Sequence, residues 1–151
     1  MKQILIKPGQ FIFKENDPAT CLYLIRSGSV SIQKSTENGP IEVSKVGPNQ
    51  VIGEMAFFDR KARSADVVAL SDVELIEIPF ESLDPIFGPA PDYLKKIMTS
   101  LAERLRDADN SIADLKDQMR SLMGNSSKNM RQDIKEKSPL EKVLDLTKSK
   151  K

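Results

Sequence analysis

Closely spaced turn signals divide roughly the first 80 residues into short apolar segments. Turn-forming residues cluster around Gly9, Asn16, Gly28, Gly39 and Gly47, and the apolar segments between these turns are short. In segment 41–46, apolar Ile41 and Val43 alternate with polar residues, which is typical of a half-buried strand. Short strands separated by turns at this frequency indicate an all-β barrel or jelly roll. This pattern predicts a β-roll of about eight strands.

One segment, residues 52–65, carries groups suited to binding a small anion attached to a sugar. Gly53 has no Cβ, so a ligand can approach its backbone closely, and Glu54 is an acceptor-only carboxylate suited to a ribose hydroxyl. Arg63 offers a planar guanidinium that binds phosphate oxygens in pairs, and Ser64 adds a hydroxyl group. The alternative is a surface turn in which Glu54 and Arg63 form a weak ion pair.

In order and spacing, this segment resembles the phosphate-binding cassette of the cyclic nucleotide-binding domain family, which includes bacterial cAMP-responsive regulators, kinase regulatory subunits and gated channels. The matching positions are Gly53, Glu54, Ala56, Arg63, Ser64 and Ala65. The resemblance implies a β-roll at residues 1–90, with the cassette inserted between the sixth and seventh strands.

The resemblance also implies the roles of the cassette residues. Glu54 and the Gly53 amide are expected to bind the ribose 2′-hydroxyl. Arg63, Ser64 and the amides of Ala56 and Ala65 are expected to bind the cyclic phosphate. Met55 lies inside the same segment and completes the predicted ligand-binding set of the cassette.

Two residues outside the cassette are also predicted to take part in ligand binding. In the bacterial branch a Thr-Ser pair reads the adenine, and that pair falls here on Ala108 and Asp109. Asp109 can still accept a hydrogen bond from an exocyclic amine of adenine or guanine, and Ser64 keeps cGMP open as a ligand beside the favoured cAMP. Arg104 stands where that branch has an arginine near the cassette glutamate, so we expect it to pair with Glu54 when ligand is bound.

Residues 91–123 form a predicted long helix, because the chain contains neither glycine nor proline from Asp92 to Met123. Its apolar residues are spaced alternately by four and three: Leu94, Met98, Leu101, Leu105, Ala108, Ile112, Leu115, Met119 and Leu122. This heptad pattern predicts a two-stranded coiled coil and a homodimer through residues 94–122. An ion pair between Arg104 of one helix and Asp109 of the other favours a parallel arrangement of the two helices. The alternative is a monomer whose helix folds back onto the roll.

Residues 124–151 form a predicted flexible tail, with eight basic against four acidic residues. The tail has too little apolar surface to fold alone. Ser138-Pro139 is a good helix start, so a short helix at 139–147 is expected, either as a partner-binding peptide or as a frayed end. Because only 28 residues follow Met123, we expect no DNA-binding helix-turn-helix domain.

Composition excludes several other functions. The chain has no histidine and one cysteine, which rules out histidine acid–base chemistry, a histidine-ligated metal and an internal disulfide. A net charge of +1 argues against electrostatic binding of nucleic acid. With no membrane-spanning stretch and no signal-peptide pattern, the sequence predicts a cytoplasmic protein without a membrane or DNA partner.

Together these features predict a regulatory protein that binds a cyclic nucleotide, uses no cofactor or metal, and is not an enzyme. It is expected to signal through a dimeric helix to an effector protein in trans. The alternative is a structural or scaffolding coiled-coil module whose nucleotide pocket is vestigial. An enzyme acting on nucleotides is the least favoured class, because Glu54 has no accompanying base, metal set or nucleophile.

Overall fold

The structure, a computed structural model, describes residues 1–135, so the predicted helix at 139–147 lies outside the described residues. The chain divides into two compact units, Met1–Lys116 and Asp117–Lys151. The first unit contains all the strands and the candidate site, and the account below concerns that unit unless stated otherwise.

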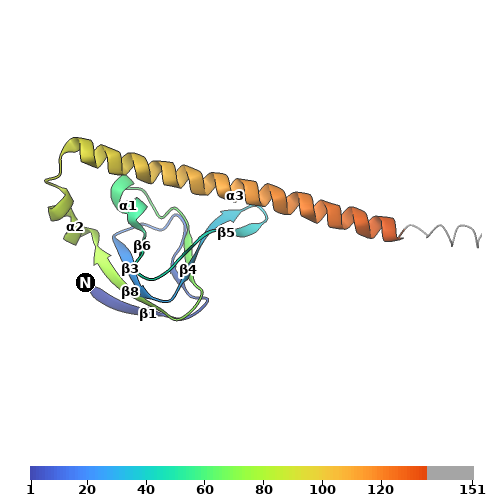
Figure 1. The fold of residues 1–151 in the computed structure, drawn as a ribbon, viewed down its shortest axis with the longest axis horizontal. Helices are drawn as coiled ribbons and strands as arrows, with labels where there is room; N and C mark the ends of the chain where they lie inside the picture. The colour runs from blue at the N-terminus through green and yellow to red at the C-terminus, as the bar shows by residue number, and fades with distance from the viewer. Residues whose placement is uncertain (136–151) are drawn as a thin grey trace, which may run out of the picture. The chain divides into compact units, whose positions relative to one another are not determined.

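Two four-stranded sheets form the body of the first unit (Figure 1). The first sheet has the order β1 (Lys2–Ile6), β8 (Val73–Pro79), β3 (Cys21–Ser27) and β6 (Val51–Ile52). The second has the order β2 (Phe11–Phe13), β7 (Asp66–Ala69), β4 (Val30–Thr36) and β5 (Gly39–Val46). All neighbouring strands pair antiparallel. The predicted eight-stranded β-roll is confirmed.

Apolar side chains from both sheets fill the space between them. The fully or almost fully buried members of this core are Ile25, Val30, Ile52, Val67, Ala69, Val73 and Leu75. Alternation within strands explains this arrangement, since Val67 and Ala69 of β7 are buried whereas the intervening Val68 is only half-buried. This core fixes the strand ends between which the cassette lies.

The cassette begins where β6 ends. Helix α1 (Glu54–Asp59) follows Gly53 directly, and a short loop then leads into β7. Phe57 of α1 packs against Phe80 and Phe87 of α2 (Phe80–Phe87), with ring centroids 5.1 and 5.4 Å away; the first pair of rings is tilted and the second is edge-on. This aromatic contact anchors α1 on the outer side of the roll.

The last helix, α3, runs from Asp92 to Lys135. It therefore continues through Gly124, past Met123, where the sequence analysis placed its end. A single glycine costs a helix only about 1 kcal/mol, and no proline follows until Pro139. None of the described helices has the combination of length and apolar character that crossing a bilayer requires.

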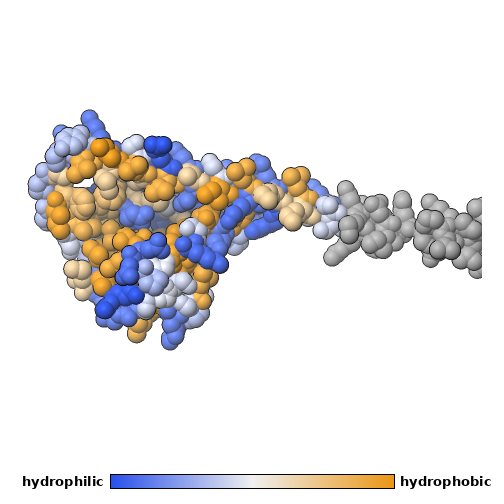
Figure 2. All heavy atoms as spheres, viewed as in Figure 1, coloured by the Kyte–Doolittle hydropathy of each residue, from blue (hydrophilic) through white to orange (hydrophobic). Residues whose placement is uncertain are grey.

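Most large apolar residues of α3 in the first unit are exposed in this chain (Figure 2). Leu101, Leu105 and Leu115 are 49%, 51% and 61% exposed, although they belong to the predicted heptad seam. Ala102, one position after Leu101, and Ala113, one position after the seam residue Ile112, are almost fully buried. Within the first unit, α3 therefore contacts the roll through a second face and leaves the seam uncovered.

Candidate functional site

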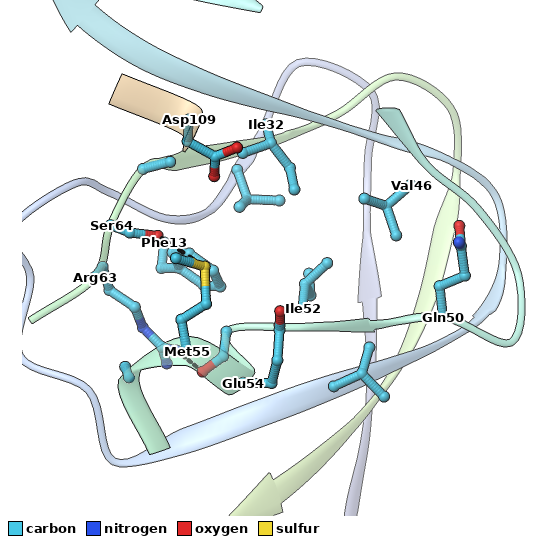
Figure 3. Close-up of a pocket in the computed structure, with 15 residues that line it drawn as sticks. Phe13, Ile32, Val46, Gln50, Ile52, Glu54, Met55, Arg63, Ser64 and Asp109 are labelled. Atoms are coloured by element: carbon cyan, nitrogen blue, oxygen red, sulfur yellow. Dashed lines mark hydrogen bonds between the residues drawn. The ribbon is translucent and has the colours of Figure 1, made fainter. Parts of the chain in front are cut away.

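A cavity of about 380 Å³ lies beside the cassette (Figure 3). Its lining comes from the cassette, the strands of the roll and α3: Phe13, Ile32, Val46, Gln50, Val51, Ile52, Gly53, Glu54, Met55, Ala56, Arg63, Ser64, Ala65, Val67 and Asp109. The volume falls in the range of small-molecule sites. Most of the wall is apolar, and the charged groups in it are Glu54, Arg63 and Asp109.

Gly53 sets the geometry at the start of the cassette. Its φ of 81° lies in the left-handed region, where residues with a Cβ are strained. An added Cβ would also lie 2.3 Å from Nη1 of Arg63. Glycine suits this position because any side chain would strain the backbone and would displace the guanidinium of Arg63.

Arg63 is the most unusual group in the site. The residue is only 4% exposed, yet it forms no salt bridge with any residue that the structure describes. Nη2 donates to the carbonyl of Cys21 at 2.7 Å, and Nη1 donates to the carbonyl of Gly53 at 3.3 Å. Nε has no hydrogen-bond partner in the part of the chain that the structure describes. Burying a cation with an unsatisfied donor costs folding free energy unless an anion pairs with the charge and accepts the hydrogen bond.

An aromatic ring supports the guanidinium. Cζ of Arg63 lies 4.1 Å from the ring centroid of Phe13 and 5.9 Å from that of Tyr23. Cation–π contacts of this kind stabilise a charge without neutralising it. They therefore leave the positive charge of Arg63 available to a ligand in the cavity.

Hydrogen bonds from other parts of the roll hold the loop between α1 and β7. The backbone of Arg63 donates to the carbonyl of Asp17 at 2.9 Å and accepts from the amide of Asn16 at 2.9 Å. Nζ of the buried Lys34 donates to the carbonyl of Ser64 at 2.5 Å and to Oε1 of Glu15 at 2.6 Å. The main chain at Arg63 and Ser64 is thus held in place before any ligand arrives.

Two carboxyl groups share the cavity with Arg63. Burial raises the pKa of Glu54, and the neighbouring Asp109 raises it further, while Arg63 partly opposes the shift. Burial also raises the pKa of Asp109, and the charge of Lys34 partly opposes that shift. Both carboxyls therefore favour the neutral form more than exposed ones do.

The structure brings most of the predicted site residues together. Gly53, Glu54, Met55, Ala56, Arg63, Ser64, Ala65 and Asp109 all line the cavity. Arg104 does not, since it is exposed on α3 and is absent from the lining. Within the described residues it has no ion pair with Glu54, so its predicted contact with that residue in a ligand-bound state stays a prediction.

Sequence reasoning missed three groups that shape the site: Phe13, Gln50 and Lys34. Phe13 belongs to an alternating pair with Phe11, which signalled a strand but not a ligand wall. Lys34 lies in β4, two positions after the half-buried Ile32, and no sequence signal revealed its exposure of only 8%. The described residues hold no cluster of side chains suited to a metal ion.

Comparison with known sequences identifies the domain. The family described as "Cyclic nucleotide-binding domain" matches residues 3–88. The CRP-like cAMP-activated global transcriptional regulator of Mycobacterium tuberculosis is 29% identical over 108 residues, covering 71% of this chain and 48% of that protein. The Cyclic AMP receptor protein of Thermus thermophilus is 33% identical over 106 residues, covering 70% and 49%. The chain spans about half the length of these curated relatives.

Solved structures share the fold. The cAMP-bound form of the EAL enzyme Bd1971 superposes with a TM-score of 0.69 at 28% identity, over 85% of this chain and 34% of that one. The cGMP-bound form of the same enzyme gives a TM-score of 0.65 at 30% identity, over 83% and 34%. The Catabolite Activator Protein of Thermus thermophilus gives 0.59 at 31% identity, over 76% and 55%. Since the family match covers more than half of its length, this chain belongs to the cyclic nucleotide-binding domain family.

Proposed function

We propose that this chain is a regulatory protein that binds a cyclic nucleotide in the cavity beside the cassette. The observation that carries the proposal is the buried guanidinium of Arg63, which has an unpartnered Nε and no salt bridge among the described residues. A phosphate group beside this guanidinium would supply both the missing negative charge and an acceptor for Nε. Glu54 lines the same cavity and supplies an acceptor for a sugar hydroxyl (Figure 3).

The proposed contacts follow the chemistry of the ligand. Glu54 and the Gly53 amide take the ribose 2′-hydroxyl. Arg63 and the Ser64 hydroxyl take the cyclic phosphate, assisted by the amides of Ala56 and Ala65. In support of this, Oγ of Ser64 makes only a weak contact of 3.7 Å with the sulfur of Met55, which a phosphate oxygen can displace.

The base is proposed to meet Asp109, the one cavity-lining residue from α3. Its carboxylate can accept from the exocyclic amine of adenine or of guanine. We favour cAMP and keep cGMP as the second ligand, because the solved relative Bd1971 is described in a cAMP-bound and in a cGMP-bound form. The wide apolar wall of the cavity suits either purine.

The output is proposed to pass through α3. The uncovered heptad seam supports a homodimer through residues 94–122, and Arg104 lies on the exposed surface where a cross-strand pair with a second copy would form. An effector protein in trans would then read the state of the dimer. The same seam also supports the second candidate, an assembly module with a vestigial pocket, which predicts dimerisation without nucleotide binding.

The test is a melting-temperature scan of the full chain against cAMP, cGMP and a cyclic dinucleotide. A ligand that binds the folded state and not the unfolded state raises the melting temperature, and its stabilising free energy is RT ln(1 + L/Kd), where L is the free ligand concentration. Stabilisation by cAMP, with the nucleotide recovered intact after incubation, supports a non-enzymatic binder. No stabilisation by any of the three ligands would reject nucleotide binding and leave the assembly module.

A further inference from the structure

The carboxylate of Asp59, at the end of α1, is fully buried against α3. Its Oδ2 accepts from Nε of Arg106 at 2.9 Å and from Nη2 of the same residue at 2.6 Å. The side chain of Asp59 is 0% exposed and that of Arg106 is 17% exposed. A buried carboxylate is strongly destabilised without a partner, so this ion pair ties the two helices together.

Arg106 also contacts the turn that leads to the ligand site. Its Nη1 donates to the carbonyl of Ala62 at 3.2 Å, and Ala62 directly precedes Arg63. The other oxygen of Asp59 accepts from the amide of Lys61 at 3.1 Å. One arginine from α3 therefore holds both ends of the short turn between α1 and the phosphate-binding arginine.

The same face of α3 carries the rest of the contact with the cassette. Oγ1 of Thr99 donates to the carbonyl of Phe58 at 3.1 Å, and Ala102 is buried one turn further on. Asp109, three positions after Arg106, lines the cavity itself. In Figure 1, α1 lies between the strands of the roll and the first half of α3. This face is distinct from the heptad seam, so docking on the cassette leaves the seam uncovered.

These contacts have a consequence for ligand binding. If α3 leaves the cassette, Asp59 loses its partner, the Ala62 carbonyl loses a donor, and Asp109 leaves the cavity wall. A ligand that favours the ordered cassette therefore also favours the docked helix, and linkage makes the effect reciprocal. Arg104, exposed on the same helix, forms no ion pair with the cassette within the described residues.

We infer that Arg106 is a positioning residue that couples nucleotide occupancy of the cassette to the docking of α3, through Asp59 and the Ala62 carbonyl. This inference rests on the proposed function, because it concerns regulation of the same site. It assigns to Arg106 the coupling role for which the sequence suggested Arg104.

The experiment compares the full-length chain with Arg106→Ala, Arg106→Lys and the control Lys96→Ala, an exposed cation of the same helix. Calorimetric titration with cAMP and with cGMP gives affinity, and hydrogen–deuterium exchange reports on residues 57–63 and 92–116. We expect Arg106→Ala to lose roughly fivefold or more in affinity, in the lower range of allosteric couplings. Nucleotide should protect 92–116 in the wild type but not in this variant. Arg106→Lys should be intermediate, and Lys96→Ala should match the wild type.

Unchanged affinity together with unchanged nucleotide-dependent protection in Arg106→Ala would overturn the inference. If that variant fails to fold, the Asp59→Asn/Arg106→Gln pair replaces it under the same criteria, because it removes the buried charge and Gln is too short to reach Ala62. If the wild type binds neither nucleotide, the proposed function fails. The contact of Arg106 with Asp59 and Ala62 is then tested without ligand. Faster exchange in both 57–63 and 92–116 of Arg106→Ala supports its role in holding α3 on the cassette, and unchanged exchange rejects that role.

Discussion

The guanidinium of Arg63 lies where a side chain on Gly53 would be: a Cβ on Gly53 would lie 2.3 Å from Nη1 of Arg63. The guanidinium in turn donates to the carbonyl of Gly53 at 3.3 Å. Ten residues apart in sequence, the two form a single unit in which the absence of one side chain makes room for the charge of the other.

Replacing Gly53 with alanine should both strain the backbone and displace the guanidinium. Gly9→Ala is a matched control, because Gly9 has the same φ of 81° but nothing within 4 Å of an added Cβ. Both variants should lose stability by about 1–2 kcal/mol from the left-handed backbone. Only Gly53→Ala should also weaken cAMP binding in calorimetric titrations. Equal affinities of the two variants would show that the guanidinium position does not matter.

Removing the charge of Arg63 should abolish the main phosphate contact. We expect Arg63→Ala to bind cAMP at least tenfold more weakly, since a hydrogen bond to a charged group contributes roughly 1.5–3 kcal/mol. The fold should be retained, because no carboxylate is left unpaired by the change. Arg26→Ala, which removes a half-exposed arginine paired on the surface with Glu74, is the control. Calorimetric affinity equal to that of the wild type would reject the assignment of the cavity.

The carboxyl of Asp109 should make the ligand-free protein less stable as the pH rises. Burial raises the pKa of Asp109 in the folded state, so between its ordinary value near 4 and the raised one the folded chain binds more protons than the unfolded chain. The penalty for the charged form is therefore absent at low pH and complete once the pH exceeds the raised pKa. Asp109→Asn should raise the free energy of unfolding at pH 7.

Urea denaturation from pH 4.5 to 8 measures this effect. The variant should show a shallower fall of stability with pH than the wild type, also because Asp109 no longer raises the pKa of Glu54. Asp107→Asn, an exposed carboxylate on the same helix, is the control and should keep the wild-type slope. A wild-type slope in Asp109→Asn would contradict the raised pKa.

The exposed seam of α3 should hold two copies together. Leu105→Glu places a charge in the centre of the seam, where the leucine is 51% exposed in one chain, and should shift the protein to monomers in sedimentation experiments. Ser100→Glu adds the same charge to the same helix outside the seam and should leave assembly unchanged. A wild type that sediments as a monomer at micromolar concentration would reject the proposed dimer.

The local parts of the site follow from the sequence because they are contiguous. Gly53 to Ala56 and Arg63 to Ala65 are two short runs, and the backbone at each run places its side chains at one cavity edge. The strands were equally predictable, since a period of two and frequent turns leave few alternatives for segments of this length. Order and spacing along the chain therefore determined the roll and the cassette.

Only the tertiary structure decided which distant groups complete the site. Phe13 lies 50 residues before Arg63 in the sequence, yet its ring centroid is 4.1 Å from Cζ of Arg63. No local sequence pattern reveals this contact. The docking face of α3 was equally hidden, because sequence periodicity reports apolar seams, and this face combines two small alanines with the buried ion pair of Arg106. Charge pairing and close backbone approach, unlike hydrophobic burial, leave no periodic signal, so the residues that join helix to cassette emerge only when both are in place.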